Sequence, residues 1–385
     1  MSDIVALKDL CEIDITDGTH KTPTYSNEGF IFLSSKNVTS GKIDWEDIMY
    51  IPQWLHDELY KRIAPKKDDI LLAKNGTTGV AAIVDKDEIF DIYVSLALIR
   101  PDKRKILPRY LLHAINSEPS KKFFDSHLKG IGVPNLHLTH IRETPINVPS
   151  FAQQQYIIDI LDKLESNISL RKQQLSKLDE LVKSRFIELF GECKNSVRLG
   201  DCCEVHARIG WQALTRDEHM KTGDYMLITG TDFKNGEINY STCVYVAKER
   251  YEMDKHIILR DNDVLITKDG TIGKVAIVHN LPKPATLNAG VFVVRPDERF
   301  NKEYIANVFK GPLFSDYVEA SKTGATIKHL NQKHLVEFMI PVPSLDEQEA
   351  FAQFTQQTDK SKFEIQKSLE KLETLKKALM QKYFG

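Results

Sequence analysis

Apolar residues along this chain follow two different periods. Short apolar runs such as GFIFLSS (29–35), DILLAK (69–74) and GVAAIV (79–84) are bounded by Gly, Asn, Asp and Pro, which is typical of β-strands joined by turns. The stretches that follow residues 150 and 344 instead space their apolar side chains by three and four, which predicts long amphipathic helices. Shorter helices are expected at 108–116, 119–127, 302–310 and 312–321.

Each long helix is expected to begin at a capping box. Ser150 is followed by Gln153 and Ser344 by Glu347, a spacing that lets each pair satisfy free backbone N–H groups. The sustained repeat of about 3.5 residues predicts that the two helices pair as an antiparallel coiled coil. The alternative is two amphipathic helices, each packed on its own domain. The expected seam consists of Ile157, Leu161, Leu164, Ile168, Leu175, Leu178, Val182, Ile365, Leu369, Leu372, Leu375 and Leu379.

The chain is a tandem repeat. DDILLAKNGTTGVAAIV (68–84) recurs as NDVLITKDGTIGKVAIV (262–278), and ALKDLCEI (6–13) recurs as RLGDCCEV (198–205). VPSFAQQQ, which opens the first long helix, recurs as VPSLDEQE before the second. The number of residues between each segment and its counterpart is nearly the same along the whole chain, which indicates two copies of one unit. The copies differ most at 19–62 against 211–256, where GTHKTPTYSNEG in the first faces WQALTRDEHMKTG in the second.

The predicted fold class is α+β: two tandem globular α/β domains separated by two long antiparallel coiled-coil helices, with pseudo-two-fold symmetry. The short β-rich runs favour a mainly antiparallel or mixed sheet in each domain. The predicted boundaries are 1–149 for the first domain, 150–191 for the central helix, 192–343 for the second domain and 344–385 for the C-terminal helix.

The composition is that of an ordinary globular protein. The chain has 385 residues, of which 42% are hydrophobic and 28% charged. It contains no apolar run long enough for a transmembrane helix and no secretory signal at its N-terminus, so a cytoplasmic protein is expected. The five cysteines form no CxxC pair, which indicates reduced thiols.

The sequence offers little catalytic chemistry. The glycines of GTTG (76–79) and GTIG (270–273) lack the GxxxxGK[ST] spacing of a phosphate loop and predict tight turns between strands. No GxGxxG, HExxH or GxSxG motif is present. His137 and His140 stand three apart but lack a second ligand pair, so no metal site is expected. We therefore expect no enzymatic activity and no cofactor.

In their order and their constant offset, these motifs resemble those of the specificity (S) subunit of type I restriction–modification systems. The resemblance covers the whole chain. It rests on the duplicated unit, the GTTG and GTIG turns, the VPSFAQQQ and VPSLDEQE segments, and the short DGTHKTP and RIGWQ segments.

The resemblance implies two target-recognition domains, each reading one half of a split sequence in double-stranded DNA. It implies that the long helices act as a spacer and as a docking surface for modification (methyltransferase) subunits, with restriction subunits joining through the complex. It also implies that this subunit carries no methyl-transfer or cleavage chemistry. Because the middle parts of the two copies diverge, the two half-sites are expected to differ.

DNA contacts are expected from polar side chains on loops, since such side chains reach base edges and phosphates. Lys74 and Lys268 occupy the same place in both copies, which suits phosphate contact better than sequence reading. The first-domain candidates are Thr19, His20, Lys21, Lys36, Asn37, Lys74, Asn75 and Thr77, and the second-domain candidates are Arg208, Trp211, Gln212, Arg216, Lys234, Lys268 and Thr271.

The net charge of −2 argues against strong DNA binding by the chain alone. We therefore expect weak, salt-sensitive binding that tightens only when partner subunits close around the DNA. The near-neutral charge also keeps two alternatives open. One is a structural coiled-coil adaptor whose globular ends bind protein. The other is an orphan S subunit without restriction activity.

Overall fold

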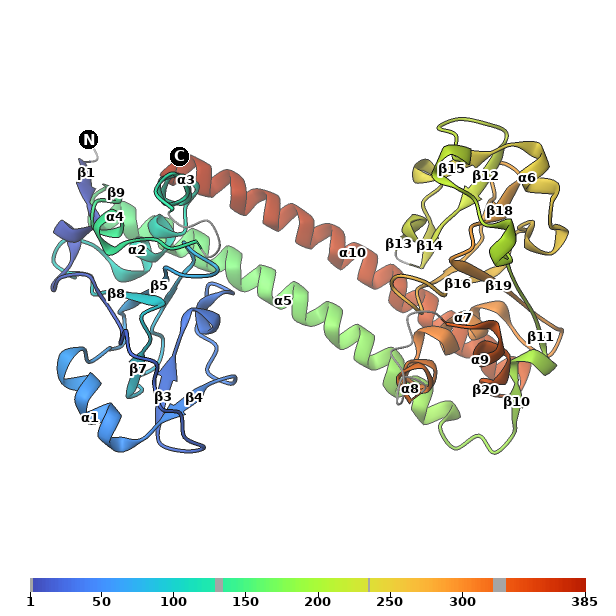
Figure 1. Ribbon diagram of the computed structural model, residues 1–385, viewed down its shortest axis with the longest axis horizontal. Helices are drawn as coiled ribbons and strands as arrows, with labels where there is room; N and C mark the ends of the chain where they lie inside the picture. The colour runs from blue at the N-terminus through green and yellow to red at the C-terminus, as the bar shows by residue number, and fades with distance from the viewer. Residues whose placement is uncertain (1–2, 129–133, 235, 321–329) are drawn as a thin grey trace. The chain divides into compact units, whose positions relative to one another are not determined.

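The computed structural model describes residues 3–128, 134–234, 236–320 and 330–385 (Figure 1). The chain divides into two compact units, one formed by Met1–Lys172 with Lys367–Gly385 and the other by Gln173–Gln366. Each unit therefore combines one sequence repeat with a part of each long helix. Both units contain helices and β-sheets, as the α+β prediction requires.

The first unit contains two β-sheets and a separate strand pair. One sheet has the order β2 (Thr16–Asp17), β8 (Leu96–Ile99), β5 (Ile70–Ala73), β6 (Ala81–Ile83), with antiparallel neighbours throughout. The other has the order β4 (Met49–Ile51), β3 (Phe30–Leu33), β7 (Phe90–Ile92), and β3 pairs with β7 in parallel. The separate antiparallel pair is β1 (Asp3–Ala6) with β9 (Pro145–Val148), and the helices are α1 (Gln53–Arg62), α2 (Pro108–Ile115), α3 (Glu118–Ser126) and α4 (Leu138–Arg142).

The second unit repeats this topology. Its sheets have the orders β11 (Cys203–Ala207), β19 (Val291–Pro296), β16 (Val264–Thr267), β17 (Val275–Ile277) and β15 (Val244–Val246), β12 (Tyr225–Ile228), β18 (Ala285–Leu287). β10 (Ser196–Arg198) pairs with β20 (Met339–Pro341), and β13 (Phe233–Lys234) with β14 (Glu237–Ile238). The helices are α6 (Lys248–Glu252), α7 (Lys302–Lys310), α8 (Pro312–Ala320) and α9 (Gln332–Glu337). The four short helices predicted from the sequence correspond to α2, α3, α7 and α8.

Short 3-10 helices connect many of these elements. They are η1 (Leu7–Leu10), η2 (Ser35–Val38), η3 (Leu199–Asp201), η4 (Gly210–Gln212), η5 (Arg216–Glu218), η6 (Gly230–Asp232), η7 (Tyr240–Thr242) and η8 (Lys255–Ile257). Three of them, η2, η5 and η6, begin with capping boxes of their own, which fix the start of the turn.

The two long helices are α5 (Phe151–Phe190) and α10 (Leu345–Phe384), and their predicted capping boxes are present. The Gln153 N–H donates to Ser150 Oγ at 3.4 Å, and the Ser150 N–H donates to Gln153 Oε1 at 3.3 Å. The Glu347 N–H donates to Ser344 Oγ at 3.3 Å, and the Ser344 N–H donates to Glu347 Oε2 at 2.8 Å. Each box satisfies N–H groups that the first helical turn leaves free.

The long helices run antiparallel in both units. In the first unit, Glu165 of α5 meets Lys376 at 2.7 Å, and Lys172 further along α5 meets Glu373, which comes earlier in α10, at 3.2 Å. In the second unit, Asp179 meets Lys362 at 2.5 Å. The predicted antiparallel pairing of α5 with α10 is therefore confirmed within each of the two units.

Most of the expected seam faces inward. Ile157, Leu161, Leu164 and Leu369 are buried. Leu375 is 48% exposed and does not belong to the seam, because the neighbouring Leu372 and Leu379 take the inward positions. The half-buried seam residues are Ile168, Leu175, Leu178, Val182, Ile365, Leu372 and Leu379.

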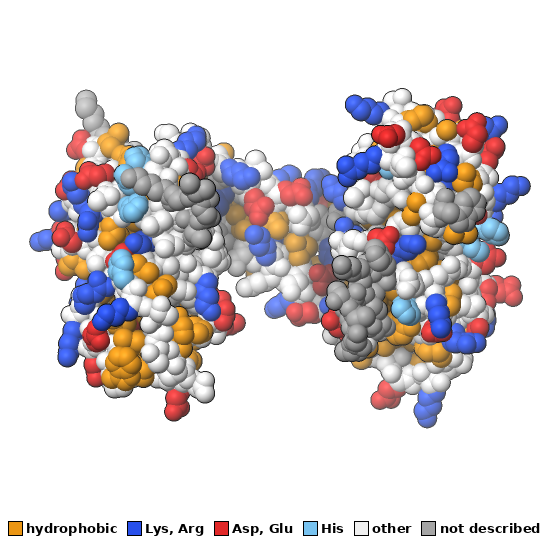
Figure 2. Space-filling view, viewed as in Figure 1, with side chains coloured by type: hydrophobic (Ala, Val, Ile, Leu, Met, Phe, Trp, Pro, Cys, Tyr) orange, Lys and Arg blue, Asp and Glu red, His pale blue; other side chains and the backbone are white. Residues whose placement is uncertain are grey.

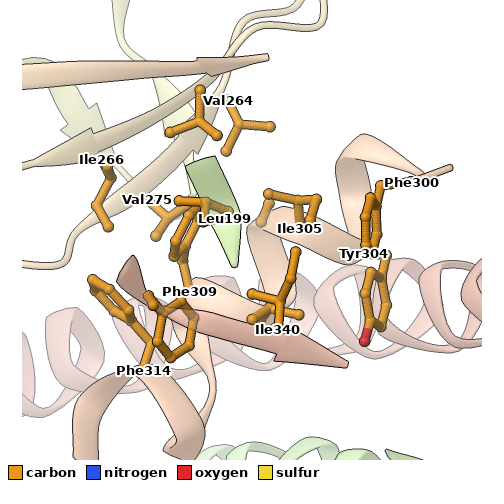
Figure 3. Packing of buried hydrophobic residues seen from close by; sticks show 14 of the residues in the cluster. Leu199, Val264, Ile266, Val275, Phe300, Tyr304, Ile305, Phe309, Phe314 and Ile340 are labelled. Atoms are coloured by element: carbon orange, nitrogen blue, oxygen red, sulfur yellow. The ribbon is translucent and has the colours of Figure 1, made fainter. Parts of the chain in front are cut away.

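The ends of the long helices complete the hydrophobic cores. In the second unit, Phe186 and Phe190 at the end of α5 belong to a hydrophobic core. The same core contains Tyr304 and Phe309 of α7 and Phe314 of α8 (Figure 3). In the first unit, the end of α10 packs against the equivalent core, with the side chains of Leu379, Met380, Tyr383 and Phe384. Burial of this apolar surface holds each helix end in place.

Within the described part of the chain, no helix is both long and apolar enough to cross a membrane.

Candidate nucleic-acid interface

The GTTG and GTIG segments form hairpin turns, as predicted. The first joins β5 to β6 and the second joins β16 to β17, both antiparallel pairs. Gly76 and Gly79 have φ of 76° and 81°, and Gly270 and Gly273 have φ of 69° and 84°. These left-handed conformations favour glycine because a side chain would be strained there. The glycines therefore shape the turns between these strands.

The structure brings two of the predicted motifs together in the first unit. The Lys74 ammonium lies 2.5 Å from the Asp17 carboxylate, and both side chains are buried. The exposed His20 ring contacts the other oxygen of Asp17 through Nε2, at 3.2 Å. Asp17, the first residue of DGTHKTP, was not among the predicted site residues. It contacts both His20 and Lys74, and it is 57 residues from Lys74 in the sequence.

The placement of Lys74 corrects one expectation. Lys74 is only 6% exposed and its charge is balanced by Asp17, so it is not free to contact a DNA phosphate in this conformation. The sequence pattern showed an equivalent lysine in both copies, but it did not show that one of them has a buried carboxylate partner.

The side chains of Asn37 and Thr19 also make hydrogen bonds within the fold. The Asn37 side chain accepts the Ser34 N–H at 2.9 Å and donates to the Asp47 carbonyl at 2.8 Å, so it holds the loop after η2. Thr19 is buried, and its hydroxyl accepts the Lys21 N–H at 3.2 Å. Neither side chain is a base-reading group as it stands.

The remaining first-unit candidates are accessible. His20, Lys21, Lys36 and Thr77 are exposed, and Asn75 is half-buried. Lys36 pairs with Asp47 at 3.4 Å and Lys21 with Glu58 at 3.9 Å. Such exposed pairs are weak, so the two lysines could exchange these carboxylates for phosphates at little cost.

In the second unit, Arg208 is 1% exposed. Its Nε donates to the Leu287 carbonyl at 2.8 Å and its Nη2 to the Thr286 hydroxyl at 3.1 Å. Burial and the nearby Arg250 lower the pKa of Arg208. Gln212 is likewise buried. Both residues are therefore fixed inside the domain and do not line its surface, which corrects the expectation that they contact DNA directly.

Lys268 differs from its counterpart Lys74. It is half-buried, with its ammonium 5.2 Å from the centroid of the Phe292 ring. Among the described residues no carboxylate lies within ion-pair distance of it. Lys268 therefore keeps a positive charge available at the turn of the second unit. Arg216, Lys234 and Thr271 are exposed, and the Trp211 side chain lies outside what the structure describes.

Charges of both signs are interspersed over each unit. On the face drawn in Figure 2, Lys and Arg side chains alternate with Asp and Glu, and neither unit shows a broad region of one sign. This agrees with the net charge of −2. Electrostatic attraction to DNA from this face is accordingly modest.

One charged cluster joins α2 to both long helices in the first unit. His113, Asp162 and Glu165 place their side-chain ligand atoms within 4.8 Å of one another. Arg109 already binds Asp162 at 2.7 Å, and Lys376 binds Glu165 at 2.7 Å. A cation would have to displace both of these partners. We therefore assign the cluster to the packing of the helices.

A comparison with protein families decides what kind of protein this is. The family model for the type I restriction modification DNA specificity domain matches residues 2–180 and again residues 192–377. The chain belongs to this family. The two matched ranges correspond to the two sequence repeats, so each repeat contributes one specificity domain.

Relatives named as specificity subunits match almost the whole chain, and two solved structures share its fold. The chain is 24% identical to the putative type I restriction enzyme MjaX specificity subunit of Methanocaldococcus jannaschii, covering 97% of this chain and 90% of that protein. It is 20% identical to the EcoBI specificity subunit of Escherichia coli, covering 96% and 83%. The crystal structure of an S subunit from M. genitalium matches with a TM-score of 0.57 at 15% identity, covering 100% of this chain and 96% of that one. A chain from a study of type I complex assembly matches with a TM-score of 0.58 at 18% identity, covering 100% and 97%.

Proposed function

We propose that this specificity subunit is non-catalytic and reads a split, asymmetric DNA target with its two recognition domains. The observation that carries the proposal is that the specificity domain occurs twice, while the residues at matching places in the two copies differ. DGTHKTP in one copy stands where RIGWQ stands in the other, and Asn75 stands where the other copy has Asp269. A domain recognises bases through the hydrogen-bond donors and acceptors that its side chains present to the base edges. Two domains with different side chains therefore select two different half-sites.

The long helices are the proposed docking surface for modification subunits. Both helices carry large apolar side chains that the fold leaves exposed, including Tyr156, Leu170 and Leu181 of α5 and Phe363 of α10. Burial of these side chains against another protein would remove apolar surface from water and stabilise the complex. Restriction subunits would then join through the modification subunits. The nearly neutral surface supports the further proposal that the chain alone binds DNA weakly.

The test is co-expression with the modification subunits of the same system, followed by sequencing of methylated positions in the host DNA. The expected result is a split motif with a fixed gap and two different half-sites. Exchanging residues 14–100 for the same region of another specificity subunit should alter one half-site and leave the other unchanged.

The near-neutral charge also favours a second candidate, a structural adaptor whose globular units bind protein. The same exchange separates the two functions. An adaptor would leave the methylated sequence unaltered when residues 14–100 are replaced.

A further inference from the structure

Two cysteines stand next to each other at the start of β11 in the second unit. The sulfurs of Cys202 and Cys203 are 3.8 Å apart, within hydrogen-bonding distance, and neither residue takes part in a disulfide. Two sulfurs that each bind one tetrahedral ion at about 2.3 Å are expected to lie about 3.8 Å apart as well. The pair is therefore spaced so that both sulfurs can bind one atom placed between them.

The first repeat carries only one of these two thiols. Cys11 corresponds to Cys203, because Cys11 forms a bridge with Pro101 and Cys203 pairs with Pro296 at the equivalent place. Leu10 stands in the place of Cys202, and each of these two residues is 3% exposed. The core position thus accepts a leucine in one copy, so packing alone does not account for a second thiol in the other.

Both cysteines line a pocket of about 480 Å³. Cys202 is buried and Cys203 is half-buried, whereas Asp201, Glu204 and Arg260, which also line the pocket, are exposed. A ligand can therefore enter from solvent, meet Cys203 first and then close onto Cys202. A cavity of about 150 Å³ is large enough for benzene. The pocket accordingly has room for a ligand that carries one aromatic ring.

The protein offers two ligand atoms at this place. Among the described residues, no further His, Cys, Asp or Glu completes a group of three with these two sulfurs within 4.8 Å. Zinc sites in proteins usually take three or four protein ligands, so zinc does not suit the pair. Trivalent arsenic binds three groups in all. An arsenical that already carries one organic substituent needs only two thiolates.

A direct disulfide between the two sulfurs is disfavoured. The peptide bond that joins Cys202 to Cys203 is trans, which holds the two Cα atoms about 3.8 Å apart. Disulfides usually span Cα separations of about 4.4–6.8 Å. An atom inserted between the sulfurs lengthens the ring and removes this conflict.

We propose that Cys202 and Cys203 form a binding site for trivalent arsenicals that carry one organic substituent. With phenylarsine oxide, each sulfur forms one bond to arsenic. The bond between arsenic and oxygen breaks, and the oxygen leaves as water with the two thiol protons. No oxidation state changes, so the reaction needs no oxidant or reductant. Because one chain holds both sulfurs, each raises the effective concentration of the other, and the product resists displacement by single thiols.

The test uses the full chain, phenylarsine oxide and intact-protein mass spectrometry. The folded wild-type chain should gain one phenylarsenic group that bridges two thiols. Mercaptoethanol, which carries a single thiol, should have to be about 100-fold or more concentrated to displace this group from wild type than from Cys202→Leu or Cys203→Ser. Dimercaptopropanol, which carries two thiols, should remove the group from wild type because it forms a chelate of its own.

The matched control is Cys11→Ser. Cys11 is half-buried, as Cys203 is, but it has no neighbouring cysteine, so this variant should keep the resistant group. Cys202→Leu copies the Leu10 and Cys11 pair of the first repeat and is therefore expected to fold. Thermal melting checks each variant, and Cys203→Ser gives the same information if Cys202→Leu unfolds.

The outcomes separate clearly. A resistant group on the folded wild-type chain that is lost in either variant of the pair supports the site. A resistant group that persists in both variants overturns the proposal, because other thiols then hold the arsenic. A resistant group that forms only after unfolding in urea also overturns it, since the pocket then does not admit the ligand. The same holds if wild type forms no resistant group at all.

Discussion

The ring of Phe384 lies against the ring of Tyr110, with centroids 5.4 Å apart and planes inclined at 40°, and the ring of Phe190 meets that of Tyr304 edge to face, with centroids 5.3 Å apart. In each unit the tyrosine belongs to one repeat, and the phenylalanine ends the long helix that follows the other repeat. The Tyr110 hydroxyl also donates to the Asn147 carbonyl at 2.9 Å, which fixes the ring. The last turn of each long helix thus completes the core of the unit that contains the other repeat.

The first prediction concerns this contact. Phe190 is buried among aromatic rings, so Phe190→Ala should lower the free energy of unfolding of the second unit by about 3–5 kcal/mol. Denaturant unfolding followed by aromatic fluorescence measures this change. The control is Ile187→Ala on the exposed face of the same helix, which should cost no more than about 0.5 kcal/mol. Equal effects from the two variants would show that the helix end contributes nothing to the core.

The second prediction concerns a glutamine that follows each capping box. Gln348 is fully buried, accepts the Asn301 N–H at 2.8 Å and donates to the Pro343 carbonyl at 3.0 Å. Gln154 makes the matching bonds in the first unit, to Leu107 and Pro149. Gln348→Ala leaves buried polar groups without partners and should cost about 1–3 kcal/mol. Thermal unfolding should show a clear drop for this variant and little change for Gln356→Ala, an exposed position on the same helix.

The third prediction separates the two equivalent lysines. Lys268 has a charge free for phosphate contact, so Lys268→Ala should weaken DNA binding and reduce the slope of log K against log salt by about 1. Lys74→Ala instead leaves Asp17 buried without its cation, which should destabilise the first unit by about 3–5 kcal/mol. The folded Lys74 variant should keep the wild-type salt slope. Fluorescence anisotropy at several salt concentrations measures both. A reduced slope for Lys74→Ala and not for Lys268→Ala would reverse the assignment.

The fourth prediction concerns pH and the charged cluster of the first unit. Burial by itself would raise the pKa of Asp162, but hydrogen bonds from His113 and Arg109 outweigh it and lower the pKa to about 2. A carboxyl with a lowered pKa adds stability above its unfolded value near 3.8 and loses that stability as the pH falls toward 2. Asp162→Asn should therefore be less stable than wild type at neutral pH. This difference in stability should disappear between about pH 4 and pH 2.

Melting temperatures across this pH range provide the measurement. Asp159→Asn is the control, since Asp159 is exposed and accepts a hydrogen bond from Gln155 on the same helix. A difference in melting temperature between wild type and Asp162→Asn that stays constant down to pH 2 would contradict the lowered pKa of Asp162.

The fifth prediction concerns docking on the long helices. Leu170 and Leu181 are about half exposed, so replacing both with Asp should leave the chain folded and weaken its association with modification subunits at least 10-fold. Leu164→Asp buries a charge in the seam and should lower stability as well. Size-exclusion chromatography of the co-expressed subunits distinguishes the two effects. Full assembly by the Leu170 and Leu181 double variant would place the docking surface elsewhere.

Local patterns in the sequence were sufficient for much of the fold. The repeat, the four short helices, both capping boxes and the positive-φ glycines follow from spacing and from the conformational preferences of single residues. These features depend on neighbours along the chain, so the sequence expresses them directly. The seam was predicted well where apolar residues recur regularly. It failed at Leu375, because neighbouring apolar positions competed for the inward face.

Only the tertiary structure shows which side chains from distant parts of the sequence contact one another. The sequence shows Lys74 and Lys268 as equivalents, but only the fold places Asp17 against one of them, and only the fold buries Arg208 and Asn37. It also sets Asn75 opposite Asn135. The physical reason is that a charge or an amide acquires its role from the groups around it, and these arrive from strands far apart in the chain. The sequence by itself therefore determined which family and architecture this chain adopts, and the tertiary structure decided which polar side chains remain free to meet DNA.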